Sequence, residues 1–373
     1  MKKLFLSILA VSALFTSCSN DDDNSTTASG STPIFVGSDL SNAEITGNTS
    51  LVATTEYTLQ GKLEILNGGQ LTIPAGTVIK AQGGNNTYIA VDRDSKIFIN
   101  GEPNNPVVMT SSAASPAAED WGGLVICGNA PSNTGDDSVS EVAGLTYGGN
   151  ETNHSSGVVK YLRIEYTGSS FNASKEFNGV SFFGVGAGTE VKNILAFESG
   201  DDGIEFFGGT VNASKLAIIN AYDDSLDCAD GFSGTIDGLY IEGVTKGAME
   251  ISNNGDNEAQ TPETDAKVMN ATIVRGDATL FAASENVVNY KEGGGNQTYT
   301  NIAFTGFDKF AKYSSDDTTQ ANVTAGKLDV VSFRTDDTVN ATYDEKGVLG
   351  TSNSSLVGAG SGLSKPSWVA ELE

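Results

Sequence analysis

The chain has 373 residues, of which 44 are glycine and 8 are proline, and its formal net charge is −26. Such a surplus of acids repels phosphate backbones and anionic polysaccharides, so we expect no nucleic-acid partner. Neutral or cationic ligands, and cations such as calcium, are compatible with this charge. No long stretch has the periodicity of an amphipathic helix, so we expect one large domain that is nearly all β.

Residues 1–17 are typical of a lipoprotein signal peptide. Two lysines precede an apolar run from Leu4 to Phe15, which is too short to span a bilayer stably, and small residues then lead to Cys18. This order resembles a bacterial lipobox, although Phe15 stands where leucine is usual. The resemblance implies lipid attachment at Cys18, and a plain secretory signal is the alternative.

Residues 18–32 are expected to form a flexible tether. An acidic run from Asp21 to Asp23 is followed by serine, threonine and glycine, a composition that cannot build a core. An acidic run behind a lipidated cysteine resembles the surface-export signal of lipoproteins in Bacteroidota. The resemblance implies anchorage in the outer membrane with the domain facing outward. A solvated spacer without a sorting role is the alternative.

Residues 33–322 are expected to wind into a β-solenoid. A short motif recurs at steps of 24, 22 and 23 residues, with its first apolar residue at Val180, Ile204, Leu226 and Met249. A repeat of this length is too short for a pair of helices, and its glycine, asparagine and aspartate suit tight corners. The repeat therefore predicts stacked coils.

Within each copy, alternate side chains are expected to point to opposite faces of a strand. The four residues named above would form one inward column, and the residues two places on would form a second: Phe182, Phe206, Cys228 and Ile251. The residues between the two columns would point outward: Ser181, Glu205, Asp227 and Glu250. A shift by one residue would bury those acids in the core, so the register is well determined.

Other segments continue the same alternation. They cover residues 57–65, 68–80, 95–101, 120–126 and 163–168. These segments resemble right-handed parallel β-helix lipoproteins of Bacteroidota, whose fold is that of pectin lyases. The likeness covers roughly residues 55 to 310. It implies fold and location but no reaction, because that group has no general assigned activity.

Two polar stretches, near residues 131–157 and 253–265, interrupt the coils and are expected to be loops, which often carry binding function. In residues 323–373 the period fades, and we expect a cap that covers the open end of the solenoid. The prediction is thus an all-β, right-handed parallel β-helix with coils of about 22–24 residues and a capped C-terminal end.

Cys127 and Cys228 are predicted to be buried free thiols. They lie 101 residues apart, or roughly four coils that each rise about 4.8 Å. The Cα atoms of a disulfide must approach to about 6 Å, so the two cysteines are too far apart to pair.

The acids near the repeats are the first candidates for chemistry. Asp201, Asp202, Asp223 and Asp224 fall at corners, just before the strands that carry Glu205 and Asp227. Calcium binds oxygens from carboxylates, carbonyls and water, so these four aspartates are a candidate calcium site. The alternative is a solvated acidic corner with aspartates chosen for turn geometry. No other cofactor is expected.

The same acids offer a catalytic possibility. Glycoside hydrolysis commonly uses two carboxyl groups, and acids one coil apart resemble those of polygalacturonases of the same fold. In that family Gly-His-Gly and Arg-x-Lys complete the site, whereas here the next coil reads Gly247-Ala248-Met249 and no Arg-x-Lys occurs. The acids drawn on would be Asp201, Asp202, Asp223, Asp224 and Asp227. A polygalacturonase site is therefore incomplete.

Phe183 and Phe207 are expected to face outward beside Glu205, Asp227 and Glu250. Exposed rings beside acids on a flat sheet would form a ledge for a sugar or a protein, and a loop that covers them is the alternative. The favoured hypothesis is a non-catalytic binding or scaffold lipoprotein that recognises a neutral glycan or an outer-membrane protein on this face. A polysaccharide hydrolase or lyase is the alternative.

Overall fold

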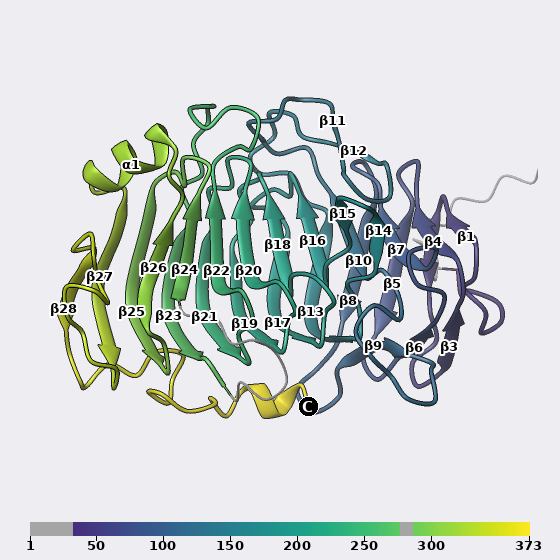
Figure 1. Ribbon diagram of the computed structural model, residues 1–373. Helices are drawn as coiled ribbons and strands as arrows, with labels where there is room; N and C mark the ends of the chain where they lie inside the picture. Colours follow the sequence, from purple (N-terminus) through teal and green to yellow (C-terminus); the bar gives the residue numbers. More distant parts are fainter. Residues whose placement is uncertain (1–32, 277–285) are drawn as a thin grey trace, which may run out of the picture. The chain divides into compact units, whose positions relative to one another are not determined.

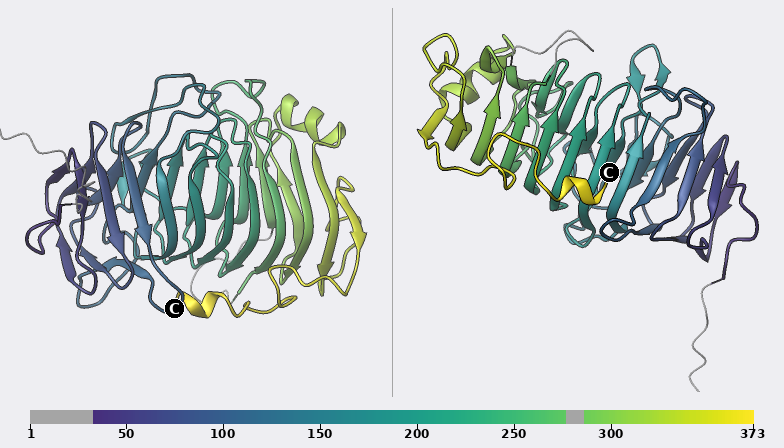
Figure 2. Two further views of the ribbon diagram at one scale, coloured as in Figure 1. Left: turned by 180° about the vertical axis from the view of Figure 1, so that it is seen from behind. Right: turned by 90° about the horizontal axis from the view of Figure 1, so that it is seen from below.

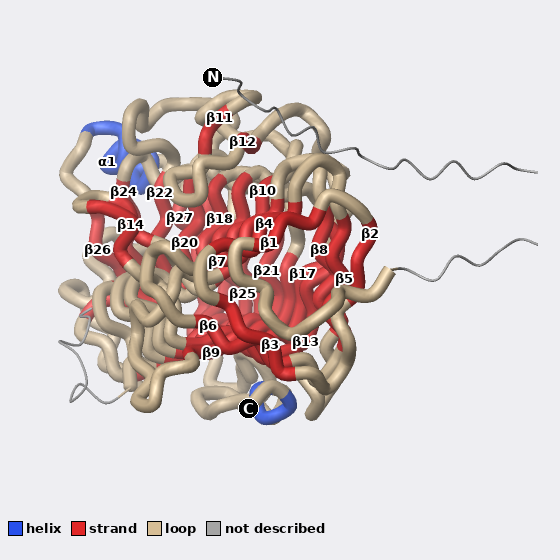
Figure 3. The backbone as a smooth tube through the Cα atoms, turned by 90° about the vertical axis from the view of Figure 1, so that its right-hand side faces the viewer, coloured by secondary structure: helices blue, strands red, loops and turns tan. Residues whose placement is uncertain are grey.

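Two long sheets of parallel strands are stacked coil upon coil in the computed structural model, which describes residues 33–276 and 286–373 (Figure 1). The predicted signal peptide, the lipidation site Cys18 and the tether lie outside the described residues. Seen along the stack, the strands of each sheet lie behind one another (Figure 3). The architecture confirms the predicted right-handed parallel β-helix.

The ten-stranded sheet follows one path of hydrogen-bonded neighbours. Its strands are β1 (Ala43–Ile45), β4 (Lys62–Ile65), β7 (Tyr88–Val91), β10 (Leu124–Cys127), β16 (Val180–Phe183), β18 (Ile204–Phe207), β20 (Asp224–Ala229), β22 (Gly247–Ser252), β24 (Asn286–Lys291) and β26 (Lys309–Tyr313). This sheet carries the predicted repeats and the acids of the candidate site.

The 14-stranded sheet forms the other walls of the coils. Its strands are β2 (Asn48–Ser50), β3 (Glu56–Leu59), β5 (Gln70–Pro74), β6 (Val78–Ala81), β8 (Lys96–Asn100), β9 (Val107–Ser111), β13 (Gly157–Glu165), β17 (Glu190–Phe197), β19 (Ala213–Ile219), β21 (Thr235–Glu242), β23 (Lys267–Val274), β25 (Gln297–Thr305), β27 (Leu328–Thr335) and β28 (Leu349–Ser352). From β16 to β27 successive strands alternate between the two sheets, so each coil adds one strand to each.

The predicted inward columns are in register. Val180 pairs with Ile204, Ile204 with Leu226 and Leu226 with Met249, and all of them are fully buried. The second column is also confirmed, and within it the rings of Phe182 and Phe206 stack with centroids 4.9 Å apart. The coils therefore share one continuous apolar core, as the repeat predicted.

A bend with left-handed backbone conformation crosses the 14-stranded sheet. Gly238, Asn270 and Asn301 stand at equivalent positions of successive strands, with φ of 85°, 56° and 58°. Glycine and asparagine tolerate this conformation better than other residues. Asn301 Nδ2 donates to Asn270 Oδ1 at 2.6 Å, so the side chains also link one coil to the next. The need for left-handed backbone at these bends thus explains part of the glycine and asparagine content.

Both cysteines are buried free thiols, as predicted. Cys228 lies in the inward column on β20, whereas Cys127 on β10 points away from the core into a separate cluster of aromatic side chains. Strands β16 and β18 separate them in the sheet, which keeps the two sulfur atoms apart.

The two stretches expected to be loops meet beside the ten-stranded sheet. Residues 131–157 include β11 (Ser138–Val139) and β12 (Thr146–Tyr147), which pair antiparallel. Asn133 Nδ2 donates to the backbone oxygen of Asn253 at 2.9 Å, and Asn254 Nδ2 donates to Asn133 Oδ1 at 3.0 Å. A second hairpin, β14 (Ser170–Asn172) with β15 (Lys175–Glu176), stands near them. These segments form a wall along one side of the sheet.

The C-terminal part differs from the expected end cap. Strands β27 and β28 extend the 14-stranded sheet, and α1 (Asp317–Thr324) precedes them. The residues after β28 then run back along the outer face of that sheet to the short 3-10 helix η1 (Val369–Glu371) (Figure 2). Trp368 and Leu372 pack there against Leu195 and Tyr240. The tail follows this path because it buries the apolar side chains that point outward from this face of the sheet.

Candidate functional site

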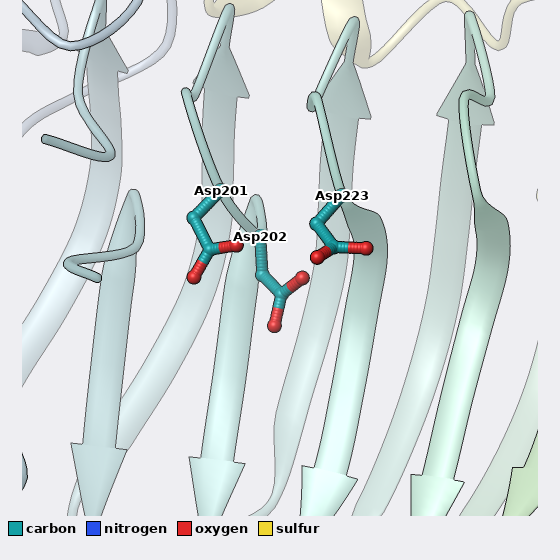
Figure 4. Close-up of side chains that lie close together, drawn as sticks. All are labelled: Asp201, Asp202 and Asp223. Atoms are coloured by element: carbon teal, nitrogen blue, oxygen red, sulfur yellow. The ribbon is translucent and has the colours of Figure 1, made fainter. Parts of the chain in front are cut away.

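Carboxyl groups gather on the outer face of the ten-stranded sheet, where β18, β20 and β22 lie side by side. Glu205, Asp227 and Glu250 are register partners on these strands, as predicted. The corner aspartates Asp201, Asp202 and Asp223 lie beside them, and one carboxylate oxygen from each lies within 4.8 Å of the others (Figure 4). The parallel register therefore concentrates negative charge in one place.

A second group of acids adjoins the first and shares Asp202 with it. One carboxylate oxygen each from Asp202, Glu205 and Asp227 lies within 4.8 Å of the other two. All three residues are only 7% exposed. Glu205 and Asp227 point away from the apolar core, as the register predicted, and Asp202 and Glu205 line a small hollow that Glu141 and Lys175 help to wall. The acids thus lie on the floor of a covered site.

Hydrogen bonds fix several of these carboxylates. Asn178 Nδ2 donates to Glu205 Oε2 at 2.6 Å, and the backbone N–H of Asp224 donates to Asp202 Oδ1 at 2.9 Å. Asn289 Nδ2 donates to Asp224 Oδ1 at 2.9 Å. Asp227 Oδ1 is different, because it is buried and has no hydrogen-bond partner among the described residues. A buried polar atom of this kind is rare in proteins.

Two of the lysines beside the acids form ion pairs with them. Lys291 Nζ forms an ion pair with Glu250, and Lys246 Nζ forms one with Asp223. Burial raises the pKa of Asp202, Glu205, Asp224 and Asp227 well above the usual range, and the neighbouring carboxylates raise it further. The pKa of Asp201 rises to about 8, mainly through burial and then through Glu176 and Asp223. The acids thus favour either a bound proton or a bound cation.

The expected exposed ledge of Phe183 and Phe207 is wrong. Their rings stack with centroids 4.1 Å apart, but they are only 1% and 8% exposed. Tyr147 of β12 packs on Phe183 at 5.1 Å, and Val142 joins the same cluster. The side chains face outward from the coil, as predicted, and residues 131–157 cover them. The alternative expectation, that a loop covers the two rings, is confirmed.

The acids line a hollow of about 200 Å³ at the centre of a longer depression. Toward β26 it adjoins a hollow of about 790 Å³, and both are lined by Asp224, Glu250 and Lys291. On the other side it adjoins a hollow of about 420 Å³ beside the β11–β12 hairpin, with Glu141 and Lys175 in both linings. We call the three hollows together the acidic groove.

Several residues of the acidic groove were missed by the sequence reasoning. Asn178 stands 24 residues before Asp202, at the equivalent place in its motif, so the repeat offered a signal for it. Asn289 and Lys291 lie on β24, one coil after β22, and the loop of residues 253–265 lengthens that coil, so the spacing is lost. Glu141 and Lys175 come from insertions outside the repeat, and no local pattern marks them.

The sequence-predicted site residues are brought together in part. Asp201, Asp202 and Asp223 form one group of carboxylates, while Asp202, Glu205 and Asp227 form the other. Asp224 belongs to neither group, although it lines the groove. Its carboxylate is held by Asn289, and Glu250 by Lys291.

A match to a protein family agrees with this architecture. A family model described as a pectate-lyase-like β-helix domain matches residues 43–373. Among solved structures, the crystal structure of the Dettilon tailspike protein is similar at 12% identity and a TM-score of 0.31, and the match covers 82% of this chain and 61% of that chain. The comparison with the curated proteins found no match. Because the family model spans most of the sequence, the chain belongs to the family of pectate-lyase-like β-helix domains.

Proposed function

We propose that the chain binds a polysaccharide along the acidic groove. The observation that carries this proposal is the sharing of lining residues between the central hollow and a larger hollow on each side of it. A chain of several sugar units could therefore lie across the carboxylates. Membership of a pectate-lyase-like family supports a carbohydrate as the ligand class.

A neutral glycan suits the groove better than an acidic one. The net charge of −26 and the carboxylates of the central hollow would repel uronate groups. Sugar hydroxyls, in contrast, donate hydrogen bonds to carboxylate oxygens. Tyr313 lines the largest of the three hollows, with Lys346 Nζ 5.9 Å from its ring centroid, and tyrosine rings commonly contact sugars. Tyr313 thereby takes the place of the buried pair Phe183 and Phe207 in the binding hypothesis.

A direct test measures binding of neutral polysaccharides by affinity electrophoresis. We expect wild-type protein to be retarded, and Tyr313→Ala to bind about tenfold more weakly, a loss equivalent to about 1.4 kcal/mol. The matched control is Tyr161→Ala, which removes a partly buried tyrosine from β13 of the other sheet. Equal binding by wild type and Tyr313→Ala, or no binding to any neutral glycan, would contradict the proposal.

Catalysis is a second candidate, favoured by the position of the acids in the narrow centre of the groove. Hydrolysis requires one carboxyl group to protonate the leaving oxygen and a second carboxylate beside the anomeric carbon. Oxygens of Asp201, Asp202 and Asp223 within 4.8 Å of one another bring such groups together. New reducing ends from incubated polysaccharide, abolished by Asp201→Ala, would replace the non-catalytic hypothesis. Product with an ultraviolet-absorbing double bond would indicate a lyase.

We also propose that the mature protein is attached to the outer membrane by lipid on Cys18 and faces the outside. The support is the sequence order of lysines, apolar run, small residues, cysteine and acids. None of the helices in residues 33–276 and 286–373 has the length and apolar character needed to cross a bilayer. Metabolic labelling with a radioactive fatty acid tests the anchor, since Cys18→Ser would lose the label. Protease added to intact cells tests exposure, and full protection would contradict it.

A further inference from the structure

The unpartnered oxygen of Asp227 points to a ligand that completes the site. Asp227 Oδ1 is buried without a hydrogen-bond partner among the described residues, and the whole residue is only 7% exposed. Leaving a buried carboxylate oxygen unsatisfied is costly, so native proteins normally supply a donor, a water or a cation. Acids surround this atom, which favours a cation.

The neighbouring carboxylates supply further oxygens at a suitable spacing. One oxygen each from Asp202, Glu205 and Asp227 lies within 4.8 Å of the others. Small rotations of these side chains would bring all three oxygens to the roughly 2.3–2.6 Å at which Ca²⁺ binds. We propose that Asp202, Glu205 and Asp227 hold one divalent cation, with Ca²⁺ as the best match to this set of oxygen ligands.

Other contacts orient the ligands for this role. Asn178 holds one oxygen of Glu205, and the backbone N–H of Asp224 holds Oδ1 of Asp202. Such outer contacts fix carboxylates in metal sites. Lys291 and Lys246, which also line the acidic groove, form their ion pairs with Glu250 and Asp223 rather than with the three ligands. The ligand set therefore carries negative charge that a cation would neutralise.

Water can complete the coordination. Calcium takes about six to eight oxygens, more than the three carboxylates provide. Asp202 and Glu205 line the central hollow of about 200 Å³, which gives water a place beside the proposed ion. The site differs from the four-aspartate site expected from the sequence, because Asp224 is held by Asn289 and Asp223 by Lys246.

The test is calorimetric titration of Ca²⁺ into the full chain stripped with EDTA, with no glycan present. We expect one saturable site per chain, and a melting temperature that rises by roughly 4 °C at a hundredfold excess over Kd. Asp227→Asn should weaken binding at least tenfold. The matched control is Asp329→Asn, which removes an exposed acid from β27 of the other sheet and should bind like wild type.

Each outcome decides for or against the site. Absence of saturable heat and of any melting shift with Ca²⁺, Mg²⁺ or Mn²⁺ would overturn it, as would equal weakening by the control. Near-ultraviolet circular dichroism in EDTA establishes whether Asp227→Asn is folded. If that variant is unfolded, the Ca²⁺ affinity of Glu205→Gln is measured instead, and it should also fall at least tenfold. Since no glycan is used, failure of glycan binding leaves the cation site standing, and the reverse also holds.

Discussion

Asp230 provides a stability switch whose size follows from its surroundings. It lies just after β20, beside the β11–β12 hairpin, and lines the hollow there with Tyr147 and Asp256. Burial, followed by the charges of Glu141, Glu292 and Asp256, raises its pKa from 3.8 to about 7. The folded protein therefore holds the proton more tightly than the unfolded chain does. Stability from this group is present at low pH and is lost as the pH rises toward 7.

The magnitude follows from linkage. Between pH 5 and pH 7 the unfolded carboxyl is ionised, whereas the folded one stays mostly protonated until it is half ionised near pH 7. The stability lost over these two pH units is therefore about 2.3 kcal/mol. Asp230→Asn removes this dependence, because the amide is neutral throughout. Asparagine also tolerates the φ of 56° found here. We therefore expect the variant to melt higher than wild type, by more at pH 7 than at pH 5.

The assay is thermal melting of wild type, Asp230→Asn and the exposed control Asp329→Asn at pH 5, 6 and 7. With an unfolding entropy proportional to chain length, about 2.3 kcal/mol corresponds to roughly 3 °C between the ends of that range. The reasoning is refuted if Asp230→Asn keeps the wild-type dependence on pH. A control that also loses the dependence would show that general charge, not this buried carboxyl, controls it.

Three further predictions concern packing. Phe206→Ala should reduce the free energy of unfolding in urea by about 3–5 kcal/mol, because the ring stacks against Phe182 and Phe232 at 4.9 and 4.6 Å; a loss below 1 kcal/mol would contradict this packing. Tyr147→Ala should uncover the aromatic cluster under β12 and raise the fluorescence of a bound hydrophobic dye, whereas unchanged fluorescence would mean that the cover stays closed. Trp368→Ala should speed proteolysis after β28, since its indole packs on the 14-stranded sheet; wild-type cleavage rates would argue against that contact.

Local periodicity explains why much of the fold could be predicted. The column from Val180 to Met249 repeats at nearly constant spacing, and parallel pairing carries this spacing directly into space. The outward direction of Glu205 and Asp227 followed from the same alternation. Register, core and the position of the acids are therefore properties that a short stretch of sequence can encode.

The covering of the site could not be predicted in this way. Phe183 and Phe207 are buried by residues that precede β16 and belong to no repeat, and nothing in their own strands signals this cover. Lys291 reaches Glu250 from the neighbouring strand β24, and the loop of residues 253–265 lengthens the coil between them and hides the spacing. Contacts between insertions depend on where long loops settle, which the alternation of a strand does not determine.

The returning C-terminal tail changes how the solenoid can come apart. Coils that touch only their neighbours can unwind one at a time from either end. Here the tail bonds to several coils in succession: Ala359 N–H donates to Thr272 Oγ1 at 2.9 Å, and Asn104 N–H donates to the backbone oxygen of Glu371 at 3.0 Å. Unfolding that begins at the β28 end must therefore also break the tail's hydrogen bonds to strands farther along the stack. By contacting several coils at once, the tail couples their unfolding, so we expect these coils to unfold as one cooperative unit.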